Sequence, residues 1–301
     1  MKFPIFISSI ILLLTTAISP PSHAEDVGTV KSVDILPYRD AVKGFKDAVK
    51  ANVYEYVIEN GDNSTILLSL KGTDLIFTLG SDALTLVKDE IKDKPIVFTF
   101  VLNPNTDFKS RSPHITGIDI NIPPEEQFNA LLQVVPQVKQ IGVIYDPSKS
   151  QSIIDEAEAA AKKLGVSLVI RKINSKEEAI NAISTLEGNV DAIWMAPDTT
   201  AITTESINYM LLFAFRNRIP VIGISDKYVK SGVLLALSFD SEDIGRQAGE
   251  LANRILSGED VKKFSLIKPR IVKLSINLNT AEKIGIKIPE RVIRLADRVY
   301  K

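Results

Sequence analysis

Polar and charged side chains recur directly after short apolar runs of this sequence. The candidates are Tyr38, Gly80, Ser81, Asn103, Asp146, Ser148, Asp198, Thr199, Ser225 and Asp226. Hydroxyl, amide and carboxylate groups of this kind hold a small polar molecule through hydrogen bonds and charge. Asp, Asn and Ser are also the usual residues of turns and helix caps, so each one alone has an ordinary structural alternative. Taken together, they predict the polar entrance of a ligand-binding site.

Two of these positions suit opposite charges on a ligand. Gly80-Ser81 is a turn of small residues between an apolar run and a helical stretch, and it leaves free amide groups at a positive helix end. Such a turn suits a carboxylate or another anion. Asp198 could complement a ligand ammonium, and its alternative role is to cap a helix that starts near Thr203.

Aromatic residues near the same positions could add an apolar wall to the site. Tyr38, Phe100 and Trp194 are the candidates. Phe100 and Trp194 lie within predicted strands, so packing in the core is the expected role of these two.

The chain has few of the residues that enzymes usually use for catalysis. The sequence has two histidines and no cysteine, and His23 lies in the N-terminal segment, so His-based triads and Cys or paired-His metal sites lack parts. There is no G-x-x-x-x-G-K-[ST] or G-x-G-x-x-G nucleotide pattern. An enzyme that uses the carboxylates Asp146 and Asp198 for acid–base work is the alternative. We predict a binding protein that has no catalytic residues, metal or cofactor.

Short apolar runs alternate with helical stretches along the chain. The runs are 33–36, 75–79, 96–102, 141–145, 167–170, 192–196, 220–224 and 233–237. Runs without polar alternation are typical of strands that are buried on both faces. Stretches such as 152–165 and 244–258 keep one apolar face and end at Gly165 and Gly258. The alternation predicts an α/β fold with parallel sheets between layers of helices.

The number of strand–helix units favours two sheets over a single one, so we predict two Rossmann-like lobes. We assign 25–121 to the first lobe, 122–239 to the second, 240–272 to a return into the first and 273–301 to a final segment of the second. Ile120–Pro124 and Phe239-Asp240 are the expected crossings. A hinge of several crossings permits closure around a ligand. Ligands of open α/β sheets lie beyond the carboxyl ends of the strands, which is where the polar candidates fall.

The N-terminal segment has the pattern of a secretory signal peptide. Lys2 precedes an apolar run from Phe3 to Ile18, and Ser22-His23-Ala24 forms a small-x-small cleavage site. The run is shorter than the ~20 residues of a membrane-spanning helix, so we predict that residues 1–24 are removed. Without a cysteine there is no site for a lipid anchor after cleavage. A free periplasmic protein is the expectation.

Several stretches of the sequence resemble one family, the ABC-transporter substrate-binding proteins related to tryptophan and tyrosine binders. They are Asp74–Ser81, Pro95–Phe98, Ile115–Gly117, Ile141–Pro147, Asp198 with its following threonines, Ile244–Gln247 and Leu274–Pro289. Their order and spacing carry the resemblance, which spans nearly all of the chain after the signal segment. The part from Asn277 to Pro289 is the most distinctive.

This resemblance implies a type I periplasmic-binding-protein fold with three crossings between lobes and delivery of a small molecule to a membrane permease. It also implies that Ser81 helps to hold a ligand carboxylate and that Asp198 takes the amino group. Asn103-Pro104 departs from the Asp-Pro that relatives commonly have after the fourth strand. An amino acid or a similar zwitterion is the expected ligand.

The alternatives concern the partner rather than the fold. A ligand-sensing subunit for a membrane receptor would have the same sequence features as an importer component. A transcription regulator would need a DNA-binding headpiece before Val30, where this chain has the signal segment. The net charge of −1 and the lack of a basic stripe predict no nucleic-acid partner. We expect a monomer.

Overall fold

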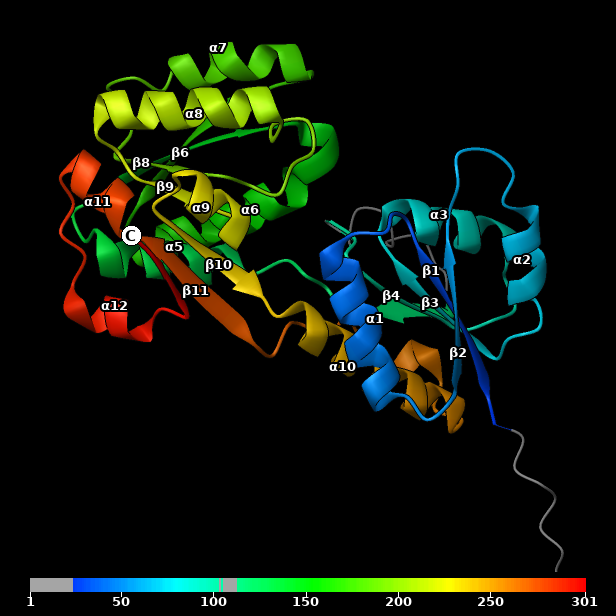
Figure 1. The fold of residues 1–301 in the computed structure, drawn as a ribbon. Coiled ribbons are helices and arrows are strands. Elements are labelled where there is room, and N and C mark those ends of the chain that lie inside the picture. Colours follow the sequence, from blue (N-terminus) through cyan, green and yellow to red (C-terminus); the bar gives the residue numbers. More distant parts are fainter. Residues whose placement is uncertain (1–23, 103, 105–112) are drawn as a thin grey trace, which may run out of the picture.

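The structure is a computed structural model that describes residues 24–102, 104 and 113–301. The predicted signal segment, apart from Ala24, and the candidate Asn103 lie outside the described residues. Within the described part, the strands form two sheets with helices on both faces, and the two lobes lie side by side (Figure 1). The predicted α/β fold with two lobes is confirmed. No helix in the described ranges has the length and apolar character that crossing a membrane requires.

The first lobe contains a parallel five-stranded sheet of order β2-β1-β3-β4-β5. Its strands are β1 (Asp26–Lys31), β2 (Asn52–Val57), β3 (Leu75–Leu79), β4 (Ile96–Thr99) and β5 (Ile115–Gly117). Helices α1 (Leu36–Ala48) and α10 (Ser241–Leu256) cover one face, and α2 (Ser64–Leu70) and α3 (Ser81–Glu90) cover the other. The central strands β3 and β4 are buried along their whole length, as their unbroken apolar runs predict.

The second lobe contains a seven-stranded sheet of order β12-β11-β10-β9-β8-β6-β7. Its strands are β6 (Gln140–Tyr145), β7 (Ser167–Lys172), β8 (Ala192–Trp194), β9 (Val221–Gly223), β10 (Leu235–Phe239), β11 (Val272–Asn277) and β12 (Arg298–Tyr300). On one face lie α5 (Pro124–Val134), α6 (Pro147–Leu164), α11 (Leu278–Ile284) and α12 (Glu290–Leu295), and on the other α7 (Ala179–Ser184), α8 (Thr204–Asn217) and α9 (Asp226–Ser231). Short 3₁₀ turns occupy Lys176–Glu178 and Val261–Lys263.

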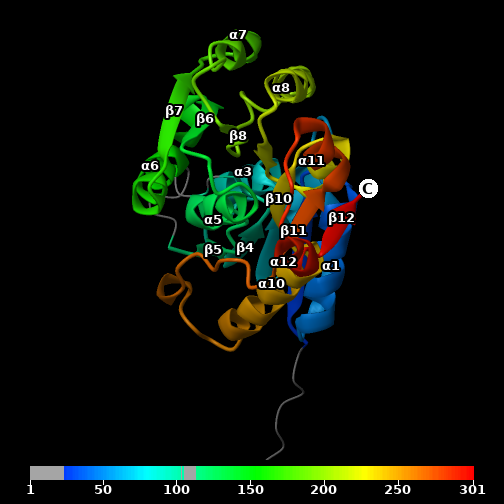
Figure 2. The ribbon, with the colours of Figure 1, turned by 90° about the vertical axis from the view of Figure 1, so that its left-hand side faces the viewer.

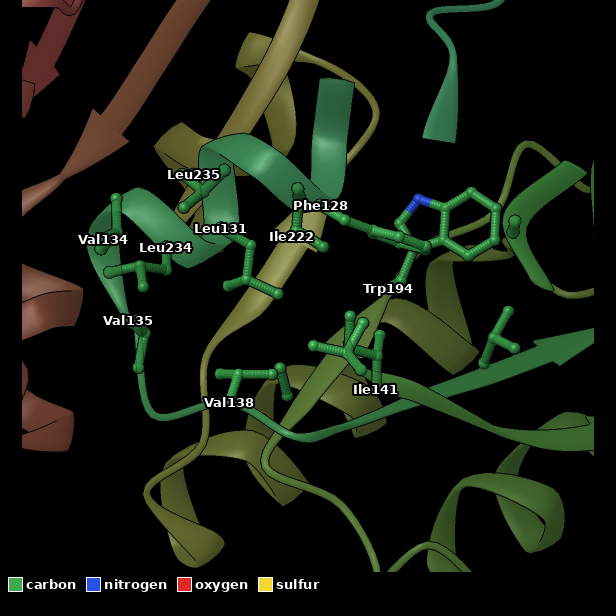
Figure 3. Close-up of a cluster of buried hydrophobic side chains, with 14 of the residues drawn as sticks. Phe128, Leu131, Val134, Val135, Val138, Ile141, Trp194, Ile222, Leu234 and Leu235 are labelled. Carbon is green, nitrogen blue, oxygen red and sulfur yellow. The ribbon is translucent and has the colours of Figure 1, made fainter. Parts of the chain in front are cut away.

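The core of the second lobe is centred on Trp194. Its side chain is fully buried and meets Phe128 edge-on, with 5.2 Å between the ring centroids (Figure 3). The indole Nε1 donates a hydrogen bond of 2.9 Å to Gln127 Oε1 on α5. The expected core role of Trp194 is therefore confirmed.

The chain passes between the lobes three times. It leaves the first lobe after β5, returns at the junction of β10 and α10, and enters the second lobe again before β11. Two of these passages run together, because Asp119 N donates to Ile267 O and Ile267 N donates to Gly117 O. Lys268 also forms an ion pair with the buried Asp119 at 2.6 Å. The first and third crossings are thus joined by hydrogen bonds and an ion pair.

One pair of strands breaks the predicted parallel pattern, because β10 and β11 are antiparallel. The cause is the path of the chain. It leaves the second lobe at the carboxyl end of β10 and comes back through the hinge at the same end of the sheet, so β11 must run in the opposite direction.

Helices α1 and α10 lie against each other at backbone contact (Figures 1 and 2). A Cβ on Gly245 would lie 1.8 Å from Ala41 O, and one on Gly44 would lie 1.9 Å from Glu242 O. Only glycine at these two positions lets the helices approach so closely. This packing fixes the N-terminus of α10 beside that of α1, at the boundary between the lobes.

The first predicted strand is wrong. Residues 33–36 form an exposed loop and the start of α1, while β1 lies upstream at Asp26–Lys31. The apolar side chains of 33–36 are not buried by the sheet because they belong to the rim between the lobes, where Leu36 is 67% exposed.

Candidate ligand-binding site

A cavity of about 820 Å³ lies between the two lobes. The first lobe contributes the N-terminal turn of α1 and the residues after β4, and the second contributes the start of α9 and parts of β11 and β12. Hinge residues from the first and second crossings complete the wall. The volume lies in the range of small-molecule sites in proteins.

Three aromatic side chains, called here the aromatic group, form one side of the cavity: Tyr38, Phe100 and Phe239. The rings of Tyr38 and Phe100 are 4.8 Å apart between centroids, and those of Phe100 and Phe239 are 5.5 Å apart in an edge-on arrangement. Burial raises the pKa of the Tyr38 phenol, and the charge of Asp82 adds to this rise. The group joins α1, the end of β4 and the end of β10, so it connects the first lobe to the hinge.

The backbone at Phe100 adopts a conformation that is rare for a large residue, with φ of 58°. Residues held in this region cost roughly 1–3 kcal/mol and persist where the surroundings demand them. Here the left-handed turn at the end of β4 directs the ring toward Tyr38 and Phe239 rather than into the sheet. The expectation that Phe100 packs in the core is therefore only partly met, since its ring also lines the cavity.

The wall of the second lobe contains a hydrogen-bonded cluster around Asp226 at the start of α9. Asp226 Oδ1 accepts from Ser275 Oγ at 2.9 Å and Tyr300 OH at 2.7 Å, and Oδ2 accepts from Arg298 Nη1 at 2.6 Å. Burial alone would raise the pKa of Asp226, but the hydrogen bonds from Tyr300 and Ser275 and the charge of Arg298 outweigh it and lower this pKa. The carboxylate is held as an anion by its own lobe.

A second ion pair crosses the hinge. Asp240 caps α10 by accepting from Asp243 N at 3.0 Å, and its other oxygen accepts from Lys273 Nζ on β11. Burial opposes ionisation of Asp240, yet the hydrogen bond from Lys273 and those from the helix amides lower the pKa of Asp240 overall. Nearby, Glu242 binds Lys43 and Arg246.

The structure brings three of the predicted site residues to the cavity wall: Tyr38, Ser225 and Asp226. Tyr38 belongs to the aromatic group, Ser225 is the N-cap residue of α9, and Asp226 anchors the cluster described above. These three come from both lobes and lie on the interlobe wall, and their role in ligand binding remains a prediction.

The predicted anion turn at Gly80-Ser81 lies beside this wall but not in it. Gly80 is buried with φ of 96°, and a Cβ there would lie 2.6 Å from Tyr38 OH. Ser81 is exposed and begins α3. One amide of this helix end is used internally, since Ala83 N donates to Ser32 Oγ at 2.8 Å. The turn therefore supports Tyr38 from behind.

The remaining predicted residues form a network at the ends of β6 and β8. Asp198 is 2% exposed, and its carboxylate accepts from the backbone N–H groups of Asp146, Thr200 and Ala201, each at 2.8 Å. Asp146 accepts from both Ser148 N and Ser148 Oγ, and it caps α6.

The neighbours of this network also serve the protein itself. The hydrogen bond from the Ser148 hydroxyl is the largest cause that lowers the pKa of Asp146. Thr199 is exposed at the tip of the same turn, and the cap of α8 is Thr203 rather than Asp198. None of Asp146, Ser148, Asp198 and Thr199 lines the cavity.

Several cavity residues escaped the prediction. They include Asp40, Lys227, Phe239, Lys273 and Arg298. Asp40 lies two residues after the predicted Tyr38 and Phe239 lies in a predicted crossing, whereas Lys273 and Arg298 reach the wall only because β11 and β12 pair beside β10. No local sequence signal marks that pairing.

The architecture is that of the two-lobed α/β binding proteins, in which two sheets are joined by a hinge of several crossings. Residues 34–300 match a family described as ABC transporter substrate binding protein. This match covers most of the sequence, and the chain belongs to that family. Its members are substrate-binding proteins rather than enzymes, in agreement with the prediction of no catalytic activity. Membership implies a small-molecule ligand and a membrane permease, and the substrate-binding proteins of ABC importers generally act outside the cytoplasm.

Individual relatives point the same way. The chain is 26% identical over 256 residues to a tyrosine-binding protein of Clostridioides difficile, and the matched region covers 81% of this chain and 74% of that protein. In fold it is similar to an ABC domain from Streptococcus pneumoniae in complex with L-Trp, with a TM-score of 0.70, 22% identity and coverage of 92% and 100% of the two chains. It is also similar to the ligand-free, open structure of a substrate-binding protein with adhesive properties from Clostridium difficile, with a TM-score of 0.77, 22% identity and coverage of 92% and 99%.

Proposed function

We propose that this protein captures an amino acid with an aromatic or large apolar side chain between its lobes and delivers it to the permease of an ABC importer. The observation that carries this proposal is the aromatic group on the wall of an interlobe cavity. Its rings offer a flat apolar surface, and the polar groups of the second lobe face it across the same cavity.

Closure of the hinge would complete the site. A ligand shifts the balance between an open and a closed form only if it binds the closed form better. The aromatic group belongs to the first lobe and the hinge, while Ser225 and the Asp226 cluster belong to the second. A ligand that contacts both sides gains its second set of contacts only on closure, which supplies that difference.

The setting of the proposed function is the periplasm. We propose that residues 1–24 direct export and are removed, and that the released protein acts as a monomer. Glu25 would then precede β1 directly, because β1 begins at Asp26. Mass spectrometry of the N-terminus of the exported protein tests this step, and retention of residues 1–24 would contradict it.

A screen of the purified protein against the L-amino acids tests the ligand class. We expect L-tyrosine, L-tryptophan or another large apolar amino acid to raise the melting temperature and to bind with 1:1 stoichiometry by calorimetry. Small-angle scattering should show a more compact particle with that amino acid bound. Absence of binding to every aromatic and large apolar amino acid would contradict the proposed ligand class, and conversion of a bound amino acid would contradict the proposed role as a binder.

A further inference from the structure

Most charged side chains that line the cavity are already neutralised by partners within the protein. Asp226 binds Arg298 at 2.6 Å, and Asp240 binds Lys273 across the hinge. Glu242 uses one oxygen for Lys43 and the other for Arg246. These groups shape the wall, but their charges are already in use.

Two charged side chains of the cavity differ from these. Within the described residues, neither Asp40 nor Lys227 has an ion pair or a side-chain hydrogen bond, although both line the cavity. Asp40 lies on α1, two residues after Tyr38 of the aromatic group, and is half-buried. Lys227 lies on α9, next to Asp226, and is exposed. A carboxylate on the cavity wall that has no ion-pair partner can accept a ligand cation without giving up an existing contact.

The signs and positions of this pair match a zwitterion. The unpaired negative charge belongs to the first lobe and the unpaired positive charge to the second. We propose that Asp40 binds the ammonium group of the ligand and that Lys227 binds its carboxylate, so that one small molecule links the two lobes through opposite charges. This inference rests on the proposed function, and it assigns the two ends of an amino acid to residues on opposite walls.

The assignment accounts for two features of the cavity together. Tyr38 and Asp40 both line the cavity from the N-terminal part of α1, so an amino acid whose ammonium group lies at Asp40 can place its side chain against the aromatic group. Its carboxylate then faces α9, where the flanking Asp226 is neutralised by Arg298 and does not repel it. The ligand makes both ionic contacts only when the lobes approach, which couples binding to closure.

Calorimetry with three related probes tests this arrangement: L-tyrosine, tyramine, which lacks the carboxylate, and 3-(4-hydroxyphenyl)propionate, which lacks the amine. Asp40→Asn should weaken L-tyrosine and tyramine about ten- to a hundredfold and leave the propionate unchanged. Lys227→Gln should weaken L-tyrosine and the propionate similarly and leave tyramine unchanged. Asp40→Glu and Lys227→Arg should retain most of the affinity for L-tyrosine.

Matched controls come from the same helices. Asp47→Asn on α1 and Lys230→Gln on α9 change the same charges on exposed positions outside this cavity, and they should leave all three affinities unchanged. Wild-type affinity for L-tyrosine in both Asp40→Asn and Lys227→Gln would overturn the inference and leave the proposed function standing. If the wild-type protein bound none of L-tyrosine, tyramine and the propionate, both this inference and the proposed ligand class would be contradicted.

An ion pair between Asp40 and Lys227 in the empty protein is the competing explanation. Small-angle scattering of the ligand-free protein distinguishes it. A compact ligand-free particle that expands in Asp40→Asn would show a latch between the lobes and would overturn the inference. An open ligand-free particle with the same dimensions in wild type and variant supports it.

Discussion

The two walls of the cavity use their side chains in different ways. On the second lobe, Asp226 satisfies its carboxylate with Ser275, Arg298 and Tyr300. On the first lobe, Leu36 is 67% exposed and Asp40 has no side-chain partner among the described residues. The Asp226 cluster is complete without a ligand, whereas the rim of the first lobe gains most of its contacts when something fills the cavity.

This difference shows how the work of binding is divided. A wall whose polar groups hold one another keeps its shape while the cavity is empty, which lowers the cost of organising the site. A wall with exposed apolar area and a free charge supplies the gain on closure instead. Changes in the Asp226 cluster and in the core of the second lobe should therefore act mainly on stability, and changes at Lys227 and at the rim of the first lobe mainly on affinity.

The largest loss of stability is expected from Trp194→Ala in the second lobe. The side chain is fully buried, and Gln127, which lines the cavity, accepts its indole hydrogen bond. Deletion of a buried tryptophan costs about 3–5 kcal/mol of unfolding free energy, and it also leaves Gln127 Oε1 without its donor. Urea denaturation followed by circular dichroism measures the loss. Trp194→Phe should lose clearly less, and equal losses in the two variants would contradict the importance of the ring volume.

The corresponding weak point of the first lobe is the contact between α1 and α10. Gly245→Ala places a methyl group where Ala41 O lies 1.8 Å from the ideal Cβ position, so the helices must separate. We expect a loss of about 3 kcal/mol, since overpacking against backbone cannot be relieved by a rotamer change. Gly72→Ala is the control, because the nearest atom to its Cβ is 3.5 Å away. If both variants were equally stable, close packing of these helices would not limit the stability of this lobe.

Much of the fold could be predicted from the sequence, because strands buried on both faces appear in it as unbroken apolar runs. Leu75–Leu79 and Ile96–Thr99 became β3 and β4 for this reason. β1 was missed because Gly28, Thr29 and Lys31 interrupt its apolar residues. The direction of β11 was missed as well, since it depends on where the chain leaves the hinge rather than on local residues.

The binding site could be predicted only in part. An Asp at the end of a strand reads the same whether it faces a ligand or a neighbouring loop. Asp198 and Asp146 follow strands that are neighbours in the sheet. The Asp198 carboxylate accepts hydrogen bonds from the backbone N–H groups of Asp146 and Thr200, so it is satisfied within the protein. Asp40 occupies a comparable polar segment but is left without a side-chain partner in the described residues. Tertiary contacts make this distinction, and one sequence does not contain it.

Asp198→Asn sharpens the comparison within the second lobe. An amide oxygen can replace only part of the carboxylate that accepts three backbone N–H groups, so we expect a loss of about 1–3 kcal/mol in unfolding free energy. The fluorescence of Trp194, the single tryptophan of the chain, reports this unfolding. The affinity of the folded variant for L-tyrosine should remain close to that of the wild type.

The prediction from sequence that Asp198 binds the ligand amino group is tested by the same variant. A stable Asp198→Asn protein with strongly reduced affinity would support that prediction and contradict a purely structural role. Ser81→Ala is the companion variant for the predicted anion turn.

Acid should remove the stability that the ionised Asp226 gives to the second lobe. The pKa of Asp226 is lower in the folded protein than its ordinary value of 3.8, so the folded state favours the ionised form. The stability that this gives is present above the ordinary pKa and is lost as the pH falls through the folded pKa. Melting temperatures between about pH 5 and about pH 2.5 should therefore fall less steeply in Asp226→Asn than in the wild type. Parallel curves would contradict a stabilising role of the anion.

The smallest effect on stability, and the sharpest separation of stability from affinity, is expected from Leu36→Ser. Leu36 is 67% exposed and lines the cavity, so its replacement should change the unfolding free energy by less than about 0.5 kcal/mol. Closure would bury this side chain, and the lost apolar contact should weaken L-tyrosine binding roughly tenfold. Leu68→Ser is the matched control, because Leu68 is 70% exposed on α2 of the same lobe but lies outside the cavity. Equal affinities in the two variants would mean that the exposed rim of the first lobe is not a closing surface, and the division of roles between the walls would fail at that point.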